Sequence, residues 1–418
     1  MHREIAVVDY DCLTPAGLSI EASWKNLVNN RSAIGKIDRY DPGAETLFGV
    51  SAIQYGGQLP ASFDNLAGSA EVFKKWSEPS YHAVKTLTRM ILKRLDFNIA
   101  QHNPQRIAFL GGTALTSQIS RDVLTKTQKA DSKYILNQCQ NIPLSIAASE
   151  FGMQGPCFSV GSACASSGHA ILLACQFIEA GIVDCAIVVG YEFPLMPFSV
   201  GGLDWVNALY RRDEPEDRAY DDSSVASRPF SKDRRGFVLS EGAGAVFLSD
   251  IAYVRDRDWP VKGIIRGGYM NSDADHLTRA SMQNVSLCME SAIKDARCNK
   301  EDIDAINAHS TSTPIGDAVE LKALHTVFGE QMKRTPVVAN KSQLGHSLGA
   351  SSILGLNLAL EGMTRSTLLP TLNHIPDPSL PEAIIPTESM EYRHDITLLN
   401  SFGFGGTNVS LVVEGRPA

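Results

Sequence analysis

The sequence has no long apolar run and no basic tract, and its first residues do not have the pattern of a signal peptide. Its apolar stretches fall short of the roughly 18 residues that a membrane-spanning helix needs, so we expect no membrane segment. The opening MHREIAVVDYD becomes acidic at once, unlike a signal peptide, which predicts a cytoplasmic protein. Acidic residues outnumber lysine plus arginine by 46 to 38, a formal net charge of -8. This balance, without any basic stripe, argues against nucleic acid as a partner.

Closely spaced cysteine pairs are also missing. The eight cysteines are scattered along the chain. They have neither the spacing of a zinc site nor the density of a disulfide scaffold. We therefore expect no metal centre, and cysteines that are mostly reduced and buried.

What the chain does contain is the pattern of a layered α/β protein. With 418 residues and 44% apolar content it can bury a large core, as two domains or one duplicated unit. Segments with helical periodicity, such as 80–96 and 165–180, alternate with short β-rich runs. The candidate strands are EIAVVDYD, RIAFLGGTA, DCAIVVGYE, GAGAVFLSD, VKGIIRGGYM, AINAHST, TPVVAN, ITLLNSFG and NVSLVVEG. We place the division between an N-terminal half, 1–255, and a C-terminal half, 256–418. The polar segment 210–236 has no apolar periodicity and is predicted to be a long surface loop.

One cysteine lies where a flexible segment becomes strongly helical, in GSACASSGHAILLACQFIEAG. Cys164 falls at or near the N-terminus of the helix predicted over 165–180. The helix dipole there favours a thiolate, and Gly161, Ser162 and Ala163 let a substrate approach the sulfur. Cys164 is therefore a candidate nucleophile. The alternative is that it is one more small core residue.

Two histidines and a glycine-rich turn occupy similar positions. His309, in NAHSTSTPIGDAVE, follows a short strand and precedes a helix that Pro314 can start. His346, in NKSQLGHSLGASS, lies in a glycine-flanked turn between strand and helix. A lone histidine in a turn is more often structural, but α/β folds gather such turns at one end of the sheet. The turn in NSFGFGGTNVS offers backbone N–H groups for an oxyanion hole; its alternatives are a tight hairpin or a phosphate loop.

These motifs resemble the β-ketoacyl-acyl-carrier-protein synthases, in particular the elongating synthase II group of the thiolase superfamily. The resemblance runs from LTPAG through GPCFSVGSACASSGHA, SRPFSKDRRGFVLSEGAG, NAHSTSTPIGD and NKSQLGHSLGA to NSFGFGGTN. It implies a thiolase-like, duplicated five-layered α/β/α/β/α fold. It also implies a dimer, either a homodimer or a heterodimer with a chain-length-factor-like subunit.

The resemblance further implies an acyltransferase of fatty acid synthesis. Such an enzyme carries out a decarboxylative Claisen condensation of an acyl-cysteine with malonyl-acyl-carrier protein, giving 3-oxoacyl-carrier protein. Cys164 would carry the acyl group, and His309 and His346 would stabilise the malonyl-derived enolate. The backbone N–H groups of Cys164 and Phe404 would hold the oxyanion. Lys341 would organise the site electrostatically, supported by Asp317 and Glu320.

The resemblance also implies which residues bind the substrates and the carrier protein. The substrate contacts would be Leu115, His276, Thr278, Thr311, Thr313 and Phe402, with Leu115 in the segment 113–117 that limits acyl entry. An acidic carrier protein would dock on a basic patch formed by Lys74, Lys75, Arg211 and Arg212. A charge cluster is more often only a solvated face. No cofactor is expected beyond the phosphopantetheine that carries the substrates.

Several positions depart from the family pattern. Asp9, Asp11 and Ser310 stand where relatives usually carry glycine, and Gly355 stands where synthase II relatives usually carry glutamate. The loop 212–227 is longer and more acidic than usual. These departures keep open a second assignment, a ketosynthase subunit of a type II polyketide or other secondary-metabolite system. A degradative thiolase is disfavoured because the C-terminal loop lacks a second cysteine, and an initiating synthase because Cys, His and His replace Cys, His and Asn.

Overall fold

The computed structural model describes residues 4–42, 49, 51–63, 78–115, 121, 124, 126–130, 132–275, 277 and 280–416. In this part of the chain the main sheet has ten strands in the order β10-β9-β13-β14-β8-β1-β7-β6-β4-β5. Its strands are β1 (Ile5–Leu13), β4 (Ile107–Gly112), β5 (Cys157–Val160), β6 (Cys185–Glu192), β7 (Gly242–Asp250), β8 (Gly263–Ser272), β9 (Ala305–Asn307), β10 (Val337–Val338), β13 (Ile396–Gly403) and β14 (Thr407–Gly415). Two small pairs lie apart, β2 (Gly35–Lys36) with β3 (Tyr55–Gly56) and β11 (Thr367–Leu368) with β12 (Met390–Glu391).

The helices alternate with these strands. The α-helices are α1 (Ile20–Leu27), α4 (Pro79–Arg94), α6 (Tyr134–Asn137), α7 (Ile142–Phe151), α8 (Ser166–Glu179), α9 (Pro197–Asp204), α10 (Ile251–Arg255), α11 (Met282–Asp295), α12 (Pro314–Phe328), α13 (Lys341–Leu344) and α14 (Ser351–Thr364). The 3-10 helices are η1 (Ile99–Gln101), η2 (Pro104–Arg106), η3 (Ala163–Ala165), η4 (Ser223–Val225), η5 (Lys300–Asp302), η6 (Gly329–Lys333) and η7 (Leu348–Ala350). Within the described residues no helix combines the length and apolar character that spanning a membrane requires.

The ten strands form two similar five-stranded sheets joined by a short antiparallel contact. Only residues 5–7 of β1 pair with residues 263–265 of β8. On one side of this contact the order is β1-β7-β6-β4-β5, and on the other it is β8-β14-β13-β9-β10, so each strand has a counterpart. In both sheets the three strands farthest from the contact run parallel, and the antiparallel strands lie nearer to it. The chain is therefore a duplicated α/β unit.

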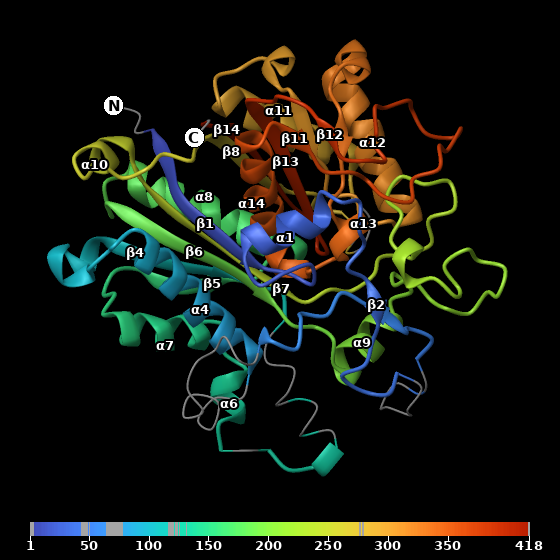
Figure 1. The fold of residues 1–418 in the computed structure, drawn as a ribbon, viewed down its shortest axis with the longest axis horizontal. Coiled ribbons are helices and arrows are strands. Elements are labelled where there is room, and N and C mark those ends of the chain that lie inside the picture. Colours follow the sequence, from blue (N-terminus) through green and yellow to red (C-terminus); the bar gives the residue numbers. More distant parts are fainter. Residues whose placement is uncertain are drawn as a thin grey trace.

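Helices cover both sheets in five layers. α4 and α7 lie on the outer face of the first sheet, α11 and α12 cover the second, and α8 and α14 pack against each other between the sheets. In Figure 1, the blue and green strands of the first half lie below the orange and red strands of the second. The apolar core follows these layers, with one cluster of buried residues under α4 and another around α8 and α14. The predicted thiolase-like α/β/α/β/α architecture is thus confirmed.

The sequence patterns located nearly all of this framework. The nine candidate strands correspond to β1, β4, β6, β7, β8, β9, β10, β13 and β14. The periodic segments 80–96 and 165–180 correspond to α4 and α8. The short edge strand β5 was not predicted, because CFSV has no more than four residues and lies among glycine, proline and serine. β5 matters because it leads directly to Cys164.

Asp9 and Asp11, two of the positions that depart from the family pattern, form a buried ion-pair cluster. Asp9 and Asp11 are each 1% exposed, on β1. Arg94 at the end of α4 donates to Asp9 Oδ2 at 2.7 Å and also pairs with Asp11, and Lys262 pairs with Asp9 Oδ1. Asp11 Oδ1 accepts the N–H of Ile20 at 2.7 Å, at the start of α1. Each buried carboxylate therefore has its cation, and these aspartates tie β1 to α4 and α1.

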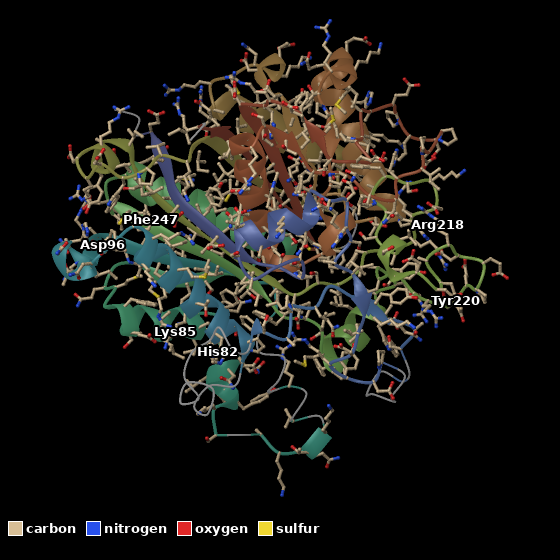
Figure 2. The ribbon with its side chains drawn as sticks, viewed as in Figure 1. His82, Lys85, Asp96, Arg218, Tyr220 and Phe247 are labelled. Carbon is tan, nitrogen blue, oxygen red and sulfur yellow. The ribbon has the colours of Figure 1, made fainter. Side chains whose placement is uncertain are left out.

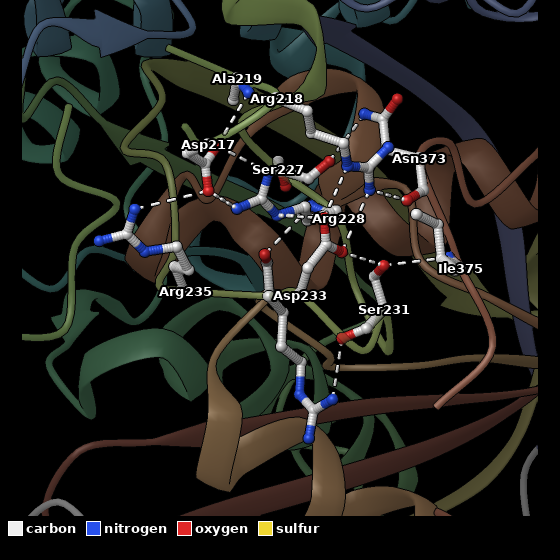
Figure 3. A network of polar contacts seen from close by, with 12 residues as sticks. Asp217, Arg218, Ala219, Ser227, Arg228, Ser231, Asp233, Arg235, Asn373 and Ile375 are labelled. Carbon is white, nitrogen blue, oxygen red and sulfur yellow. Dashed lines mark hydrogen bonds and ion pairs between the residues drawn. The ribbon is translucent and has the colours of Figure 1, made fainter. Parts of the chain in front are cut away.

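The polar segment 210–236 is a long loop, as predicted, and a buried arginine anchors it. Figure 2 shows Arg218 and Tyr220 in this loop at one side of the molecule. Arg228 is completely buried and forms a two-pronged ion pair with Asp217 (Figure 3). Its backbone N–H donates to Ser312 Oγ at 3.0 Å, in the turn that follows His309. The loop is thus held against the second half of the molecule by a buried charge pair.

Asp217 should make the fold sensitive to acid. Burial acts to raise the pKa of Asp217, but hydrogen bonds from Arg228 and Ala219 outweigh it and lower the pKa to about 2. Because this is below the ordinary value of about 4, the carboxylate stabilises the fold fully above pH 4, and the contribution disappears as the pH falls through about 2. We expect Asp217→Asn to lower the free energy of unfolding by about 3 kcal/mol at pH 7, since the buried Arg228 loses its hydrogen-bonded anion and keeps only Asp233, at 3.8 Å.

Urea unfolding of both proteins at pH 7 and at pH 4 and below measures this effect. Asp213→Asn is the matched control, because Asp213 is 41% exposed and pairs with Arg211 and Arg235 at the surface. We expect the control to change the free energy of unfolding by less than about 1 kcal/mol. Equal effects of the two substitutions at pH 7 would contradict the anchoring role of Asp217.

Candidate active site

Cys164 lies in the tight turn that joins β5 to α8. Its side chain is 6% exposed. It belongs to a cluster of apolar residues that includes Leu348, and Leu115 packs against this cluster. The end of β13 approaches closely: a Cβ atom added to Gly403 would lie 3.1 Å from the backbone nitrogen of Cys164. The C-terminal strand pair therefore touches the backbone of the cysteine, and only glycine fits at this contact.

Backbone strain marks the turns that carry the three predicted catalytic side chains. Ala163, next to Cys164, has φ +49; Ser312, in the turn after His309, has φ +72; and Leu348, in the turn after His346, has φ +39. Side chains other than glycine seldom adopt this left-handed region, which costs about 1–3 kcal/mol at each position. The first two strained turns follow a strand, β5 or β9, whereas the third follows the short helix α13. Such strain persists where the surrounding structure imposes it, and it clusters at functional sites.

The folded chain brings Cys164 into contact with His346. His346 Nε2 lies 3.0 Å from Cys164 Sγ, across a sequence separation of 182 residues. On the other side of the ring, Nδ1 lies 2.9 Å from the hydroxyl oxygen of Ser351. A serine hydroxyl can donate or accept, so it can bond either tautomer of the imidazole. His346 can therefore accept a proton from the thiol, or donate one into the site, without losing its outer partner.

His309 completes a compact group of three. Its ring lies 5.5 Å from the ring of His346, nearly perpendicular to it, and 5.7 Å from the ring of Phe402. The backbone N–H of His309 donates to Glu320 Oε1 at 2.8 Å. Its Nδ1 is buried without a hydrogen-bond partner among the described residues. The structure thus brings together Cys164, His309 and His346, the residues predicted to form the reacting site.

Burial governs the charges in this site. It raises the pKa of Cys164 to about 12, although Lys341 and the N–H of Phe404 act in the opposite direction. It lowers the pKa of His309 and His346 well below the usual value, with Lys341 adding to the effect. The resting site therefore holds a neutral thiol beside neutral imidazoles. The backbone N–H groups at this turn favour the thiolate, as predicted, but desolvation outweighs them, so the resting thiol stays protonated.

Lys341 supplies the positive charge of the site. It begins α13, and burial lowers its pKa to about 8, partly offset by Glu320, Cys164 and Asp317. The ammonium group is therefore mostly charged at neutral pH, and its field favours any negative charge that forms on the sulfur. This placement agrees with the electrostatic role implied by the sequence, for which Asp317 and Glu320 were the predicted supports.

Asp317 and Glu320 act mainly through backbone hydrogen bonds. Asp317 accepts the N–H groups of Thr311, Ser312 and Thr313 at 3.0–3.2 Å, and that of Phe230 at 2.8 Å. Glu320 Oε2 accepts the N–H of Ser310 at 2.7 Å, in addition to the bond from His309 to Oε1. The two carboxylates, from the first two turns of α12, thereby shape the turn that holds His309. Burial raises the pKa of Glu320 to about 7 against these donors.

The glycine-rich turn after β13 lies at the sulfur. The backbone N–H groups of Phe404 and Cys164 both interact with Cys164 Sγ and lower its pKa. They are therefore placed where an oxyanion hole for a Cys164-bound acyl group would need them. The Phe404 side chain is 36% exposed, and Gly405 and Gly406 have φ +84 and +69. Phe402, by contrast, is buried against His309, so the two phenylalanines of this turn differ in environment.

The other predicted binding residues fall into three groups. Leu115 packs against the Cys164 cluster and also lines a small cavity, of about 30 Å³, with Thr113 and Glu192. Thr311 and Thr313 flank the strained Ser312, with hydroxyl oxygens 3.3 Å apart. Four predicted positions lie outside the described residues: Lys74, Lys75, His276 and Thr278.

The two arginines predicted to dock the carrier protein already form ion pairs within this chain. Arg211 pairs with Asp204 at 2.6 Å and with Asp213 at 3.0 Å. Arg212 donates to the carbonyl of Tyr220 and to Asp221, and its guanidinium stacks 4.0 Å above the Tyr220 ring. These acidic neighbours neutralise much of the local positive charge. The docking role of the arginines stays a prediction.

The three central side chains are close enough together to bind one metal ion. One ligand atom from each of Cys164, His309 and His346 lies within 4.8 Å of the others. A thiolate and two imidazoles are ligands that Zn²⁺ accepts. A metal ion bound there would occupy the sulfur lone pair that nucleophilic chemistry uses.

Two residues in direct contact with the site were not predicted from the sequence. Ser351 is the first residue of α14, and Glu192 is the last residue of β6, and both positions commonly carry polar residues. Neither has a local pattern that points to the site. Their partners lie 5 and 157 residues away, at His346 and Gly349 respectively, and only the folded chain shows both contacts.

Comparisons with known proteins agree with this geometry. A family model described as "Beta-ketoacyl synthase, N-terminal domain" matches residues 2–251, and one described as "Beta-ketoacyl synthase, C-terminal domain" matches residues 262–374. The 3-oxoacyl-[acyl-carrier-protein] synthase 2 of Vibrio cholerae is 30% identical over 99% of both chains. That of Coxiella burnetii is 29% identical over 99% of this chain and 98% of its own.

Solved structures share the fold. One is a type II polyketide ketosynthase in complex with its acyl-carrier protein and bound to the hexaketide, with a TM-score of 0.85 at 22% identity over 100% of both chains. Another is the ishigamide ketosynthase/chain length factor, with a TM-score of 0.86 at 22% identity and the same coverage. At this identity the likeness concerns the fold.

The Ser351 hydroxyl should control how fast Cys164 reacts. Because the Ser351 hydroxyl supports the proton on His346 Nδ1 while Nε2 takes the thiol proton, we expect Ser351→Ala to slow alkylation of Cys164 by iodoacetamide about two- to thirteenfold, which corresponds to one hydrogen bond of about 0.5–1.5 kcal/mol. Ser351→Thr, which keeps the hydroxyl, is the matched control. Peptide mapping measures the rate, and the exposed Cys139 is an internal standard. Equal rates in the alanine and threonine variants would remove this role from Ser351.

Proposed function

The chain belongs to the β-ketoacyl synthase family of condensing acyltransferases, and on this premise we propose that it joins an acyl group held on Cys164 to malonyl-acyl-carrier protein. The product would be 3-oxoacyl-carrier protein, as in fatty acid synthesis. The observation that carries the proposal is the 3.0 Å contact between Cys164 Sγ and His346 Nε2, with His309 beside it. A family name alone does not ensure activity, but this group of side chains can perform the reaction.

Acylation begins with the neutral thiol. Cys164 transfers its proton to His346 Nε2, and the sulfur attacks the carbonyl carbon of the acyl thioester. The carbonyl oxygen becomes an oxyanion that the backbone N–H groups of Cys164 and Phe404 stabilise. When the carbonyl reforms, the C–S bond to pantetheine breaks, and the leaving thiolate takes the proton from His346. The site returns to neutral charge with the acyl group on Cys164.

Condensation uses the two histidines as hydrogen-bond donors. Their neutral form suits this task, because an N–H aimed at the malonyl thioester oxygen stabilises the negative charge that develops there. The malonyl carboxylate leaves as carbon dioxide, and the resulting enolate carbon attacks the acyl carbonyl. The C–S bond to Cys164 then breaks, and the thiolate takes one proton from solvent. The low dielectric of the buried site favours loss of the charged carboxylate.

No cofactor enters this scheme, and its partner is a carrier protein. The acyl and malonyl groups arrive on phosphopantetheine, so an acidic acyl-carrier protein is the proposed partner. A dock that includes Lys74, Lys75, Arg211 and Arg212 stays part of the proposal, as does a cytoplasmic location. The chemistry needs only a nucleophile, hydrogen-bond donors and a positive field, all supplied by side chains and backbone of this chain.

A second copy of the chain is the proposed subunit partner. β5 pairs with β4 on one edge, and the described residues supply no strand for its other edge. The segment after α6 contacts one face of β5, where Ser159 Oγ donates to the carbonyl of Gln140 at 2.9 Å. On α6 itself, Ile135 is 73% exposed and Leu136 is 45% exposed. An open strand edge beside exposed apolar side chains favours pairing of two copies through β5.

The alternative is a ketosynthase subunit of a type II polyketide system, paired with a chain-length-factor-like protein. The family departures at Ser310 and Gly355 support it, since both lie near the site. A Cβ atom added to Gly355 would meet nothing closer than Asn307 Oδ1 at 3.5 Å, so glycine is not required there by packing. Purification from the native source distinguishes the assignments, because a homodimer and a heterodimer give one and two chains respectively.

The division of labour between thiol and imidazoles can be tested by substitution. We expect Cys164→Gln to abolish condensation but to retain decarboxylation of malonyl-carrier protein, because glutamine can mimic the acylated cysteine while His309 and His346 still stabilise the enolate. His309→Ala and His346→Ala should each lower decarboxylation by about 100-fold or more, the typical effect of losing one such donor. Release of labelled carbon dioxide measures the step. A histidine variant that keeps the parental rate would lose its assigned role.

Leu115 and Phe404 should affect substrates differently. Leu115 borders both the Cys164 cluster and the cavity, so Leu115→Trp should block long acyl groups by overpacking while short ones remain usable. Phe404 is exposed between conformationally free glycines, so we propose that it swings aside for every substrate, and Phe404→Ala should lower turnover at all chain lengths. The measurement is the rate of Cys164 acylation against chain length, by intact mass. A uniform loss in Leu115→Trp would show that Leu115 does not line the acyl path.

A further inference from the structure

Glu192 is a buried carboxylate that the reaction scheme above does not use. It ends β6 and is 2% exposed. Among the described residues no lysine or arginine forms an ion pair with it. A buried charge without a cation is unfavourable unless other groups solvate it, so its surroundings should reveal why it is kept.

Backbone N–H groups from two separate segments solvate Glu192. Oε2 accepts the N–H of Ala114 at 2.7 Å and that of Gly349 at 3.1 Å. Oε1 accepts the N–H of Leu115 at 3.1 Å, and the Thr113 hydroxyl lies 3.3 Å away. One carboxylate thus bridges the segment 113–115, which follows β4, and η7, which follows His346.

The bridged segments are in direct contact with each other and with the site. A Cβ atom added to Gly349 would lie 2.4 Å from the backbone nitrogen of Ala114, so the two backbones touch. Leu348 of η7 packs in the same apolar cluster as Cys164, and Leu115 packs against that cluster. Leu115 and Glu192 also line the small cavity described above. A shift of 113–115 relative to η7 would therefore move the cavity wall relative to the reacting sulfur.

We propose that Glu192 is a positioning residue that determines acyl-chain specificity, by clamping the cavity rim at 113–115 to the turn beside Cys164 and His346. This inference rests on the proposed function, because it assumes that acyl chains enter past Leu115. With two N–H bonds from the rim and one from η7 to the same carboxylate, the rim has a single position, and a rigid pocket discriminates between chain lengths. Loss of the clamp should broaden the range of chains accepted rather than stop the chemistry.

The clamp should also respond to pH. Burial raises the pKa of Glu192 to about 7, although the N–H groups of Ala114, Gly349 and Leu115 lower it. Since only the carboxylate accepts all these bonds, the clamp is complete above pH 7 and weakens as the pH falls below it. The other titratable groups that interact with Glu192 or share its cavity are Cys164 in η3, Tyr191 in β6, Tyr81 in α4, Glu78 before α4 and Cys139 after α6.

The test compares chain-length profiles of Glu192→Gln and the parent protein. The amide keeps the size of the side chain but replaces one acceptor oxygen with an N–H₂ group that faces backbone N–H donors. Intact-mass kinetics of Cys164 acylation with carrier proteins bearing two to sixteen carbons give the ratio of best to worst rate. We expect this ratio to fall at least fivefold in Glu192→Gln. In the parent protein it should fall in the same direction between pH 8 and pH 6.

Glu361→Gln is the matched control for burying an amide in place of a carboxylate. Glu361 is 7% exposed and accepts hydrogen bonds from Tyr10 and Arg365 at the far end of α14. The chain-length profile of Glu361→Gln should therefore stay that of the parent. An unchanged ratio in Glu192→Gln, or an equal loss at every chain length, would overturn the inference. If Glu192→Gln does not fold, the pH series on the parent decides, and a flat ratio overturns it. Absence of any acylation in the parent would instead refute the proposed function.

Discussion

The contact between Cys164 and His346 is the interaction on which the rest of the structure depends. The two residues come from turns of the two halves that precede the helices of the central layer, α8 and α14; Cys164 follows β5, and His346 follows α13, which comes after β10. The duplicated fold places α8 and α14 side by side, and this brings the sulfur and Nε2 to 3.0 Å. A single half could supply a nucleophile or a base, but not both. The reacting pair therefore exists only when the five layers are assembled.

Excluding water from this contact determines the chemistry of every titratable group around it. Desolvation keeps Cys164 protonated and both histidines neutral, so a proton must move from sulfur to nitrogen during attack. The same burial would make carboxylates unfavourable, yet Asp317, Glu320 and Glu192 are retained. Each accepts several backbone N–H groups; Lys341 is a nearby positive charge for Glu320 and Asp317, and Arg234 is a second one for Asp317. Carboxylates in this arrangement define the turns that carry reactive side chains, because each oxygen specifies where several N–H groups must point.

Much of the framework could be predicted from the sequence, because strands and helices of this length leave local patterns. Nine strands, α4 and α8 follow from apolar alternation and helical periodicity. Cys164, His309 and His346 could be singled out because the sequence pattern placed each in a turn between a strand and a helix, and the motifs around them resemble one family; the structure adds the short helix α13 before His346. β5 escaped prediction because a four-residue edge strand has too few positions to show a period.

The sequence by itself determined the order of the α/β elements, the family and the identity of the three central side chains, since all of these depend on residues close together in the chain. Only the tertiary structure decided that Cys164 rests as a thiol, because its pKa depends on desolvation by residues from both halves. It also decided that Asp9 and Asp11 are matched by Arg94 and Lys262, and that Arg211 and Arg212 are engaged by acidic neighbours. Ser351 and Glu192 gained their roles in the same way. Charge, protonation and partnership depend on distances between remote residues, and these exist only after folding.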